Sequence, residues 1–319
     1  MKLAIATGFG GDPADFLRGV ADVEEIIVRD GQPMPPLPDV EAVVGGPNPD
    51  RFRAILGAAP KLRWFHTISA GVDRLMLPEL QGRPDLVMTN NSGSYDAQIA
   101  EFVIATLFAA AKRLPEHLRN QRDRKWIRGV EWSGHHAELR GATLVVIGLG
   151  SIGSEVARLA SALGMRVVGV RSDARPHPHA SRVVPSERLA DIAPEADFVA
   201  VTAALTPRTR GLVSREVIAA LKPTAWLVNI ARGPIVDEDA LLGALRARRI
   251  GGAALDVFST EPLPPESPWW ELDNAIITPH SSNSSPRLRE RSIALFRENL
   301  RRFRAGEPLL NVVDRKLGY

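Results

Sequence analysis

Short apolar runs alternate with helix-like stretches along the first hundred residues of the chain. The runs have the length of β-strands, are rich in Val, Ile and Leu, and cover residues 3–6, 26–28, 40–44, 63–67 and 86–89. Between them, residues 12–20 and 49–58 have apolar positions at helical spacing. Strands that alternate with helices favour a parallel sheet covered on both faces, because each crossover places a helix on one face.

A second alternating pattern begins at residue 142, after a long apolar run that predicts a buried helix over 99–112. Six strands are predicted at 143–147, 166–170, 198–201, 226–229, 253–256 and 275–278. Helices are predicted at 151–163, 188–193, 214–221 and 238–248, followed by one amphipathic helix at 286–304. This count is that of a complete doubly wound dinucleotide-binding fold, so the predicted fold class is α/β.

The composition narrows the class of protein. With 319 residues, the chain is long enough for two domains. It lacks cysteine, which excludes disulfides, thiolate catalysis and cysteine-ligated zinc and agrees with a cytoplasmic protein. No apolar run approaches the ~20 residues of a membrane span, so we expect no membrane partner.

The charges indicate neither a nucleic-acid partner nor a metal. Forty basic and 37 acidic residues leave a net charge of +3. The basic clusters at 119–128, 246–249 and 287–304 are typical of solvated helix faces, and no nucleic-acid recognition motif accompanies them. The adjacent His135 and His136 lack the spacing of a ligand pair, so we expect no metal.

A glycine-rich turn connects the first strand and the first helix of the second pattern. Gly148, Gly150 and Gly153 have the spacing G-x-G-x-x-G after a buried strand. The first glycine permits the tight turn, the second lets the backbone approach a pyrophosphate, and the third allows close helix–strand packing. Ser151 and Ile152 open the helix, whose N-terminal N–H groups favour phosphate. We predict a dinucleotide site here; a purely structural turn is the alternative.

The residue that distinguishes NAD from NADP is expected at the end of the next strand. An NAD site has Asp or Glu there to bind the ribose 2′-hydroxyl, whereas this chain has Arg171, followed by Ser172 and Arg175. A guanidinium pairs with a 2′-phosphate, which a carboxylate would repel, and a serine hydroxyl adds a donor. We therefore predict NADP as the preferred cofactor and NAD as the second. The alternative is an arginine that stacks on the adenine without selecting either cofactor.

Arg232, Glu261 and His280 each follow one of the last three predicted strands, where a doubly wound sheet binds its ligands. Reduction of a 2-keto acid needs a held carboxylate, a polarised carbonyl and a proton. Arginine suits the first two tasks because its fork reaches two oxygens and stays charged. Histidine suits the third, and a neighbouring carboxylate favours its protonated ring. The three residues are therefore our candidates for the reaction centre.

The sequences around these residues, 228–238, 255–264 and 277–280, resemble the signatures of the D-isomer-specific 2-hydroxyacid dehydrogenases. The resemblance is glyoxylate/hydroxypyruvate reductase-like and covers nearly the whole chain. It includes 67–73, similar to the family's substrate-carboxylate loop, and 93–101, similar to its crossing between domains. It implies an NAD(P)-dependent oxidoreductase that reduces a small 2-keto acid, such as glyoxylate or hydroxypyruvate, to the D-2-hydroxy acid.

The resemblance also implies roles for the matching residues. Arg232 would polarise the substrate, and the pair of His280 and Glu261 would supply the proton. Backbone groups around three residues of the first domain would hold the substrate carboxylate: Ser69, Ala70 and Gly71. Further cofactor contacts would come from residues in loops after strands: Pro207, Thr209, Ile230, Ala231 and Asp256. Of these, Asp256 would contact the nicotinamide carboxamide.

The family's architecture implies two doubly wound domains and a homodimer. The substrate domain, flavodoxin-like and split in sequence, would comprise residues 1–98 plus 286–319, and the Rossmann cofactor domain residues 99–285. Tyr95-Asp96 and the serine-rich segment 281–285 depart from the family's usual residues, and these departures concern substrate identity.

Two other functions use the same fold. An NAD(H)-responsive binding module, similar to a transcriptional corepressor, would keep similar residues. A formate dehydrogenase would replace the glutamate by an uncharged residue, whereas Glu261 is charged.

Overall fold

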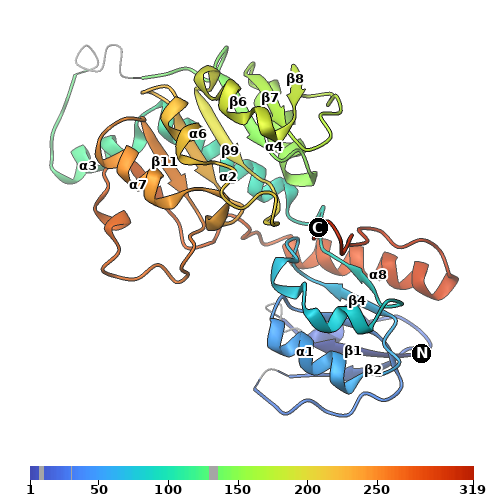
Figure 1. Ribbon diagram of the computed structural model, residues 1–319. Coiled ribbons are helices and arrows are strands. Elements are labelled where there is room, and N and C mark those ends of the chain that lie inside the picture. Colours follow the sequence, from blue (N-terminus) through green and yellow to red (C-terminus); the bar gives the residue numbers. More distant parts are fainter. Residues whose placement is uncertain (7–10, 30, 129–135) are drawn as a thin grey trace. The chain divides into compact units, whose positions relative to one another are not determined.

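The computed structural model describes residues 1–6, 11–29, 31–128 and 136–319, and it forms two compact units (Figure 1). Unit 1 comprises Met1–Tyr95 with Ser285–Tyr319, and unit 2 comprises Asp96–Ser284. The domain boundaries that the family resemblance implies, after residues 98 and 285, lie three residues and one residue further along the chain. No helix within the described ranges has both the length and the apolar composition of a membrane span.

Unit 1 is built on a parallel sheet of five strands in the order β2-β1-β3-β4-β5. The strands are β1 (Lys2–Ala6), β2 (Glu24–Ile27), β3 (Val40–Gly45), β4 (Trp64–Thr67) and β5 (Val87–Thr89). This order, 2-1-3-4-5 in chain numbering, is that of flavodoxin. The predicted flavodoxin-like sheet is therefore confirmed.

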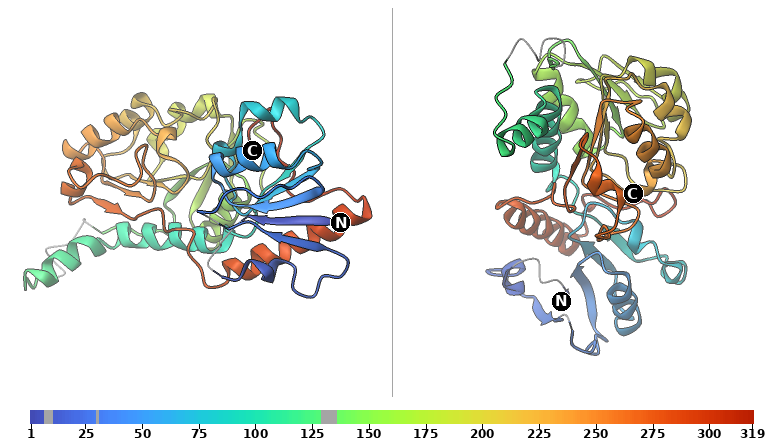
Figure 2. Two further views of the ribbon diagram at one scale, coloured as in Figure 1. Left: turned by 90° about the horizontal axis from the view of Figure 1, so that it is seen from below. Right: turned by 90° about the vertical axis from the view of Figure 1, so that its left-hand side faces the viewer.

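The two faces of this sheet are covered by helices from distant parts of the sequence. Alternate residues of β1 point to opposite faces, so Ala4 and Ala6 join a cluster with helix α1 (Pro49–Ala58), and Leu3 and Ile5 join another. The second cluster is completed by helix α8 (Leu288–Ala305), which lies beside the N-terminal strands in Figure 2. The end of the chain thus completes one face of the unit 1 core with Phe296 and Leu300.

One helix predicted in this unit is much shorter than expected. Instead of a helix over 12–20, the chain forms a single 3₁₀ turn, η1 (Pro13–Phe16). Pro13 and the Asp12 side chain, which accepts the Ala14 N–H, begin the turn in the usual way. Gly19 then takes a left-handed conformation, with φ +78°, which ends helical geometry before another turn can form.

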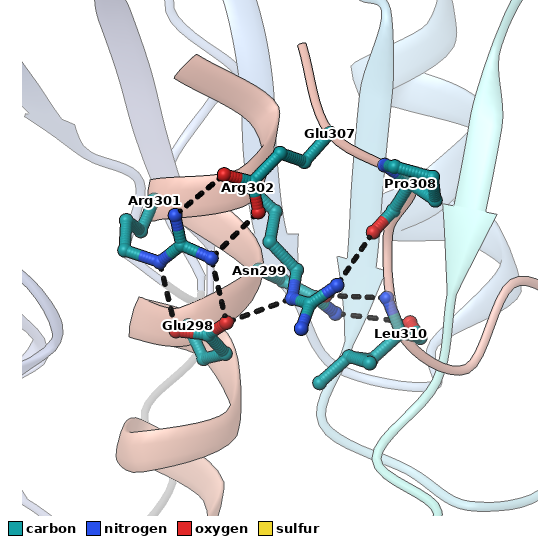
Figure 3. Close-up of polar contacts among 7 residues, drawn as sticks. All are labelled: Glu298, Asn299, Arg301, Arg302, Glu307, Pro308 and Leu310. Atoms are coloured by element: carbon teal, nitrogen blue, oxygen red, sulfur yellow. Dashed lines mark hydrogen bonds and ion pairs between the residues drawn. The ribbon is translucent and has the colours of Figure 1, made fainter. Parts of the chain in front are cut away.

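The C-terminal segment is tied to α8 by polar contacts around its last turns (Figure 3). The buried Asn299 side chain bonds both backbone groups of Leu310, at 3.1 Å through Nδ2 and 2.7 Å through Oδ1. Glu298 accepts hydrogen bonds from Arg301 at 3.0 Å and from Arg302 at 2.7 Å. The two Asn299 bonds, with one from Arg302 to the Pro308 carbonyl at 3.1 Å, fix the chain that returns from α8 toward β5.

Glu298 makes the acid stability of this region testable. Hydrogen bonds from Arg301 and Arg302 lower its pKa to about 2, below its value in the unfolded chain. These contacts therefore stabilise the fold above about pH 4.5 and are lost as the pH falls toward 2. Glu298→Gln should lower the melting temperature at pH 7 by a few degrees at most, because the group is exposed, and this deficit should shrink toward pH 2.

The measurement is thermal unfolding followed by circular dichroism at a series of pH values. Glu290→Gln, at an exposed position of the same helix, is the control. A deficit that stays constant between pH 4.5 and pH 2 would contradict the assignment.

Unit 2 is built on a parallel sheet of seven strands in the order β12-β11-β10-β9-β6-β7-β8. The strands are β6 (Thr143–Ile147), β7 (Arg166–Val170), β8 (Arg182–Val184), β9 (Phe198–Val201), β10 (Trp226–Asn229), β11 (Gly252–Leu255) and β12 (Ala275–Ile277). Numbered within the unit, the order is 3-2-1-4-5-6 with a seventh strand beyond the sixth, which confirms the Rossmann fold. The predicted count of six omitted β8, whose three residues include only one that is buried.

Helices cover both faces of this sheet. The predicted buried helix is α2 (Asp96–Ala111), which packs against α4 (Ser151–Ala162) and β10. A second helix follows directly as α3 (Leu114–Arg122), which has no buried residue. The helices between the strands are α5 (Leu189–Ile192), α6 (Arg215–Ala220) and α7 (Glu238–Arg246).

Candidate active site

The glycine turn joins β6 to α4 in a conformation that only glycine allows. Gly148 has φ +96°, and a Cβ there would lie 2.6 Å from the Cα atom of Ala203. A Cβ on Gly153 would lie 1.9 Å from the carbonyl oxygen of Gly148 and 2.7 Å from Oγ1 of Thr202. The turn and the first turn of α4 are therefore packed against each other and against the end of β9.

Gly150 differs from the other two glycines because no packing contact requires it. A Cβ there would meet no atom of the described residues within 4 Å, and its φ of −74° is open to any residue. Gly150 is also the N-cap of α4, so it offers no side chain to the first N–H groups of the helix. Open space before a helix N-terminus fits the pyrophosphate of a dinucleotide, which Ser151 and Ile152 would then adjoin.

Arg171 follows β7 directly, and its backbone N–H still bonds Val184 of β8. Its side chain pairs with Asp173, with Nε and Oδ1 2.6 Å apart, and Arg175 pairs with the same carboxylate at 2.5 Å. Burial acts to raise the pKa of Asp173, but hydrogen bonds from Arg175 and the charges of both arginines lower it. Sequence reasoning missed Asp173, which orients the two guanidinium groups and offsets one of their charges.

The predicted cofactor residues after β9 and β10 lie in tightly bonded loops. The Thr209 hydroxyl donates to the carbonyl of Ala204 at 2.6 Å and accepts the N–H of Thr206 at 2.8 Å, which fixes the loop that exposes Pro207. After β10, Ile230 and Ala231 are buried. Direct contacts of these residues with the cofactor stay a prediction.

Asp256 is buried beyond the end of β11 and organises the turn that carries His280. Its Oδ1 accepts hydrogen bonds from the Thr278 hydroxyl at 2.6 Å and from the Ser281 N–H at 2.8 Å. Its Oδ2 accepts the Ser282 N–H at 3.0 Å, and its backbone carbonyl accepts the His280 N–H at 2.9 Å. The contact with the nicotinamide carboxamide that the family resemblance implies stays a prediction beside these bonds.

His280 and Glu261 are joined directly in the structure. Nδ1 of His280 lies 2.9 Å from Oε2 of Glu261, and the other carboxylate oxygen accepts the Phe258 N–H at 3.0 Å. An ionised carboxylate only accepts, so Nδ1 carries the proton and Nε2 is the ring nitrogen left for a substrate. Both side chains remain partly exposed, at 37% for His280 and 25% for Glu261, so a ligand can reach them. His280 has φ +53°, a conformation found at functional turns.

The Arg232 loop is fixed by Asn229, the last residue of β10. The Asn229 side chain donates to the Arg232 carbonyl at 3.0 Å and accepts the Ala231 N–H at 3.1 Å. The next residue, Gly233, packs so closely on the backbone of Phe258 that a Cβ there would lie 2.2 Å from its carbonyl carbon. The loops after β10 and β11 are therefore in contact. Sequence reasoning missed Asn229, although its place at the end of a buried strand was visible.

The three predicted reaction-centre residues thus follow three neighbouring strands, β10, β11 and β12, at the same edge of the sheet. The structure joins Glu261 to His280 and brings the Arg232 loop against the turn before Glu261. When a loop that carries an arginine contacts a turn that carries an acid pair, the guanidinium can bind an anionic substrate and the pair can deliver a proton to a developing alkoxide.

The predicted carboxylate-binding residues belong to unit 1, in the loop after β4. The Ala70 carbonyl accepts a hydrogen bond from Asn90 Nδ2 at 2.9 Å, and the Ser69 carbonyl accepts the Asn91 N–H at 3.0 Å. Tyr95 adds a bond from its hydroxyl to the Ile68 carbonyl at 2.6 Å. Residues that lie 20 or more positions further on therefore hold the loop before Gly71.

No cluster of three or more His, Asp or Glu side chains suited to a metal occurs in the part of the chain that the structure describes. His136 instead lies against His117, with their Nε2 atoms 3.4 Å apart. His135, the other member of the pair that we considered as a metal ligand, lies outside the described residues.

Comparison with known proteins agrees with the fold. The family model described as "D-isomer specific 2-hydroxyacid dehydrogenase, NAD binding domain" matches residues 104–282. A glyoxylate reductase from Korarchaeum cryptofilum is 36% identical over 271 residues, which cover 82% of this chain and 79% of that protein.

Solved structures also resemble the whole chain. One is a D-isomer specific 2-hydroxyacid dehydrogenase from Xanthobacter autotrophicus Py2 in complex with NADPH and MES, with a TM-score of 0.87 and 30% identity over 100% of this chain and 99% of that one. Another is an NADPH-dependent glyoxylate/hydroxypyruvate reductase from Sinorhizobium meliloti in complex with NADP and sulfate, with a TM-score of 0.85 and 25% identity at the same coverage. With more than half of its residues matched by the family model, the chain belongs to the D-isomer specific 2-hydroxyacid dehydrogenases.

Proposed function

We propose that this enzyme reduces a small 2-keto acid, such as glyoxylate or hydroxypyruvate, to the D-2-hydroxy acid with NADPH. The observation that carries the proposal is the bond between His280 Nδ1 and Glu261 Oε2, next to the loop of Arg232. The similarity to a glyoxylate reductase and to an NADPH-dependent glyoxylate/hydroxypyruvate reductase supports the choice of substrates.

The residues divide the work of the reaction. Arg232 binds the substrate and draws electron density toward the carbonyl oxygen. His280, held by Glu261, donates the proton of its Nε2 to that oxygen. The negative charge of Glu261 stabilises the positive charge of the protonated ring. Backbone groups at Ser69, Ala70 and Gly71 hold the substrate carboxylate. The bound nicotinamide supplies the hydride that goes to C2.

NADPH is the preferred cofactor in this proposal, and NADH is the second. Arg171 and Arg175 follow the strand after the glycine turn, where the ribose 2′-position is expected. Their two charges exceed the single charge of Asp173, which leaves a net positive site for a 2′-phosphate, and Ser172 is exposed beside them. The two solved structures with NADPH or NADP agree with this preference.

Arg171→Ala should raise the dissociation constant for NADPH about 10- to 100-fold, because one charge-assisted contact is lost. The constant for NADH should change by less than about threefold, because NADH lacks the 2′-phosphate. Both constants are measured from nicotinamide fluorescence on titration. Arg188→Ala, at another exposed arginine that pairs with a nearby aspartate, is the control. Equal losses for both cofactors would indicate adenine stacking and not phosphate recognition.

A homodimer is the second part of the proposal, in line with the family. Helix α3 and the residues after it expose large apolar side chains that a monomer would leave in water: Leu114 at 47%, Leu118 at 62% and Trp126 at 94%. Sedimentation equilibrium would test it, and a monomer at micromolar concentration would contradict it.

The decisive experiment is a panel of 2-keto acids assayed with NADPH and with NADH by absorbance of the reduced nicotinamide. Oxidation of NADPH with glyoxylate or hydroxypyruvate would support the proposal. Cofactor binding without oxidation by any member of the panel would favour the binding-module function instead.

A further inference from the structure

Glu238 is a half-buried carboxylate that the proposed chemistry does not use. It is the first residue of α7, after the N-cap Asp237. Its Oε1 accepts the backbone N–H of Ser259 at 2.7 Å, which joins the start of α7 to the turn after β11. Burial raises its pKa, and the negative charges of Asp239 and Glu261 act in the same direction, while bonds from Ser259 oppose them. Burial of a carboxylate costs free energy, so we ask what the hydrogen bond from Ser259 to Glu238 holds in place.

The carboxylate of Glu238 lies where the two loops of the reaction centre meet. A Cβ on Gly233 would lie 2.6 Å from Glu238 Oε1 and 2.2 Å from both the Phe258 carbonyl carbon and the Ser259 nitrogen. Gly233 directly follows Arg232 and is buried. Gly233 therefore packs against two groups at once, the Glu238 carboxylate and the backbone at 258–259.

The turn that carries Glu261 is held at two successive amides. Glu261 itself accepts the N–H of Phe258 at 3.0 Å, and Glu238 accepts the N–H of Ser259 at 2.7 Å. The bond from Phe258 to Glu261 lies within the turn, so it cannot anchor the turn to the rest of the unit. The bond from Ser259 to Glu238 connects the turn to α7, so it can anchor the turn.

We propose that Glu238 is a positioning residue, which anchors the Glu261 turn against the Arg232 loop and so keeps Glu261 on Nδ1 of His280. The inference rests on the proposed function, because it takes the pair of Glu261 and His280 as the proton donor. The charged groups around Glu238 are Asp239 on its own helix and Glu261 on the facing turn, with His280 bonded to the latter.

The test compares Glu238→Ala, Glu238→Gln and the control Asp239→Ala. Asp239 is the next residue of α7, carries the same charge and is exposed. Glu238→Ala should lower kcat about 10- to 100-fold, the cost of a misplaced catalytic group, with the dissociation constant for NADPH unchanged. Glu238→Gln keeps an acceptor oxygen, so it should restore kcat to within about threefold of wild type. Asp239→Ala should behave as wild type.

A spectroscopic signal separates positioning from a general loss of structure. In the protein without cofactor, the ¹⁵N-coupled proton on Nδ1 of His280 should give a downfield NMR signal. Glu238→Ala should broaden or shift this signal, and Asp239→Ala should not.

The proposal is overturned if Glu238→Ala keeps the kcat and the His280 signal of Asp239→Ala. It is also overturned if the alanine variant loses melting temperature and NADPH binding together with kcat, because the role would then be structural. Failure of the proposed function would be recognised separately, since the wild-type protein would then oxidise NADPH with no 2-keto acid of the panel, or His280→Asn would keep wild-type kcat, whatever the Glu238 variants do.

Discussion

Replacing Arg232 by alanine should lower kcat/KM for a 2-keto acid by about 10²- to 10³-fold, one of the two largest effects that we expect on substrate turnover. The guanidinium is the charged donor placed after β10, and its loss leaves the carbonyl oxygen without a partner as negative charge develops. The loop itself should survive, because Asn229 holds it through backbone atoms of Ala231 and Arg232 that alanine retains. Affinity for NADPH, followed by fluorescence, should therefore stay within about twofold of wild type.

Arg232→Lys is a second variant to compare, because it keeps the positive charge but removes the guanidinium that can bind two oxygens at once. A partial recovery of kcat/KM would show that charge alone does part of the work. Arg210→Ala, at an exposed arginine of the same unit, is the control for a general loss of charge. Turnover near wild type in Arg232→Ala would remove this residue from the mechanism.

His280→Asn should lower kcat by about 10²- to 10⁴-fold, because the side chain that donates the proton is lost. Asparagine can place a donor near the position of Nδ1 and so can keep the bond to Glu261, but it has no group that replaces Nε2. The effect should therefore appear in kcat and not in the dissociation constant for NADPH. Stopped-flow absorbance of the reduced nicotinamide in single turnovers measures the step directly.

Glu261→Gln separates the two members of the pair. The amide can still accept from His280 but no longer offsets a positive ring, so reduction should decline at lower pH than in wild type. A profile that matches wild type would show that Glu261 orients the ring without stabilising its charge. An unchanged kcat in His280→Asn would remove the acid pair from the mechanism altogether.

The sheets could be predicted from the sequence because buried parallel strands are continuous apolar runs. Residues 143–147 and 226–229 have the bounds of β6 and β10, and both strands are buried over most of their length. β8 could not be found in this way, since it is a short edge strand that begins with the exposed Arg182. The helix expected over 12–20 failed for a local reason, because Gly19 is left-handed there and a pattern of apolar positions does not report φ.

The positions of the site residues followed from topology, since side chains after neighbouring parallel strands gather at one edge. The hydrogen-bond partners of these residues could not be predicted from topology. Asp173 is bonded to Arg171 and Arg175 through a turn whose shape no motif specifies. Glu238 reaches Ser259 only because Gly233 lets two loops approach closely. Asn229 could have been found, because a polar residue that ends a buried strand needs a hydrogen-bond partner.

The packing of α8 on β1 has a consequence for how the protein is made. During translation, unit 2 is complete once residue 284 has left the ribosome, whereas the first 95 residues still lack the helix that covers Leu3 and Ile5. Phe16 and Leu17 already belong to the cluster on that face, but the cluster is not complete until Phe296 and Leu300 emerge. Unit 1 therefore cannot complete its core before all of unit 2 has been synthesised.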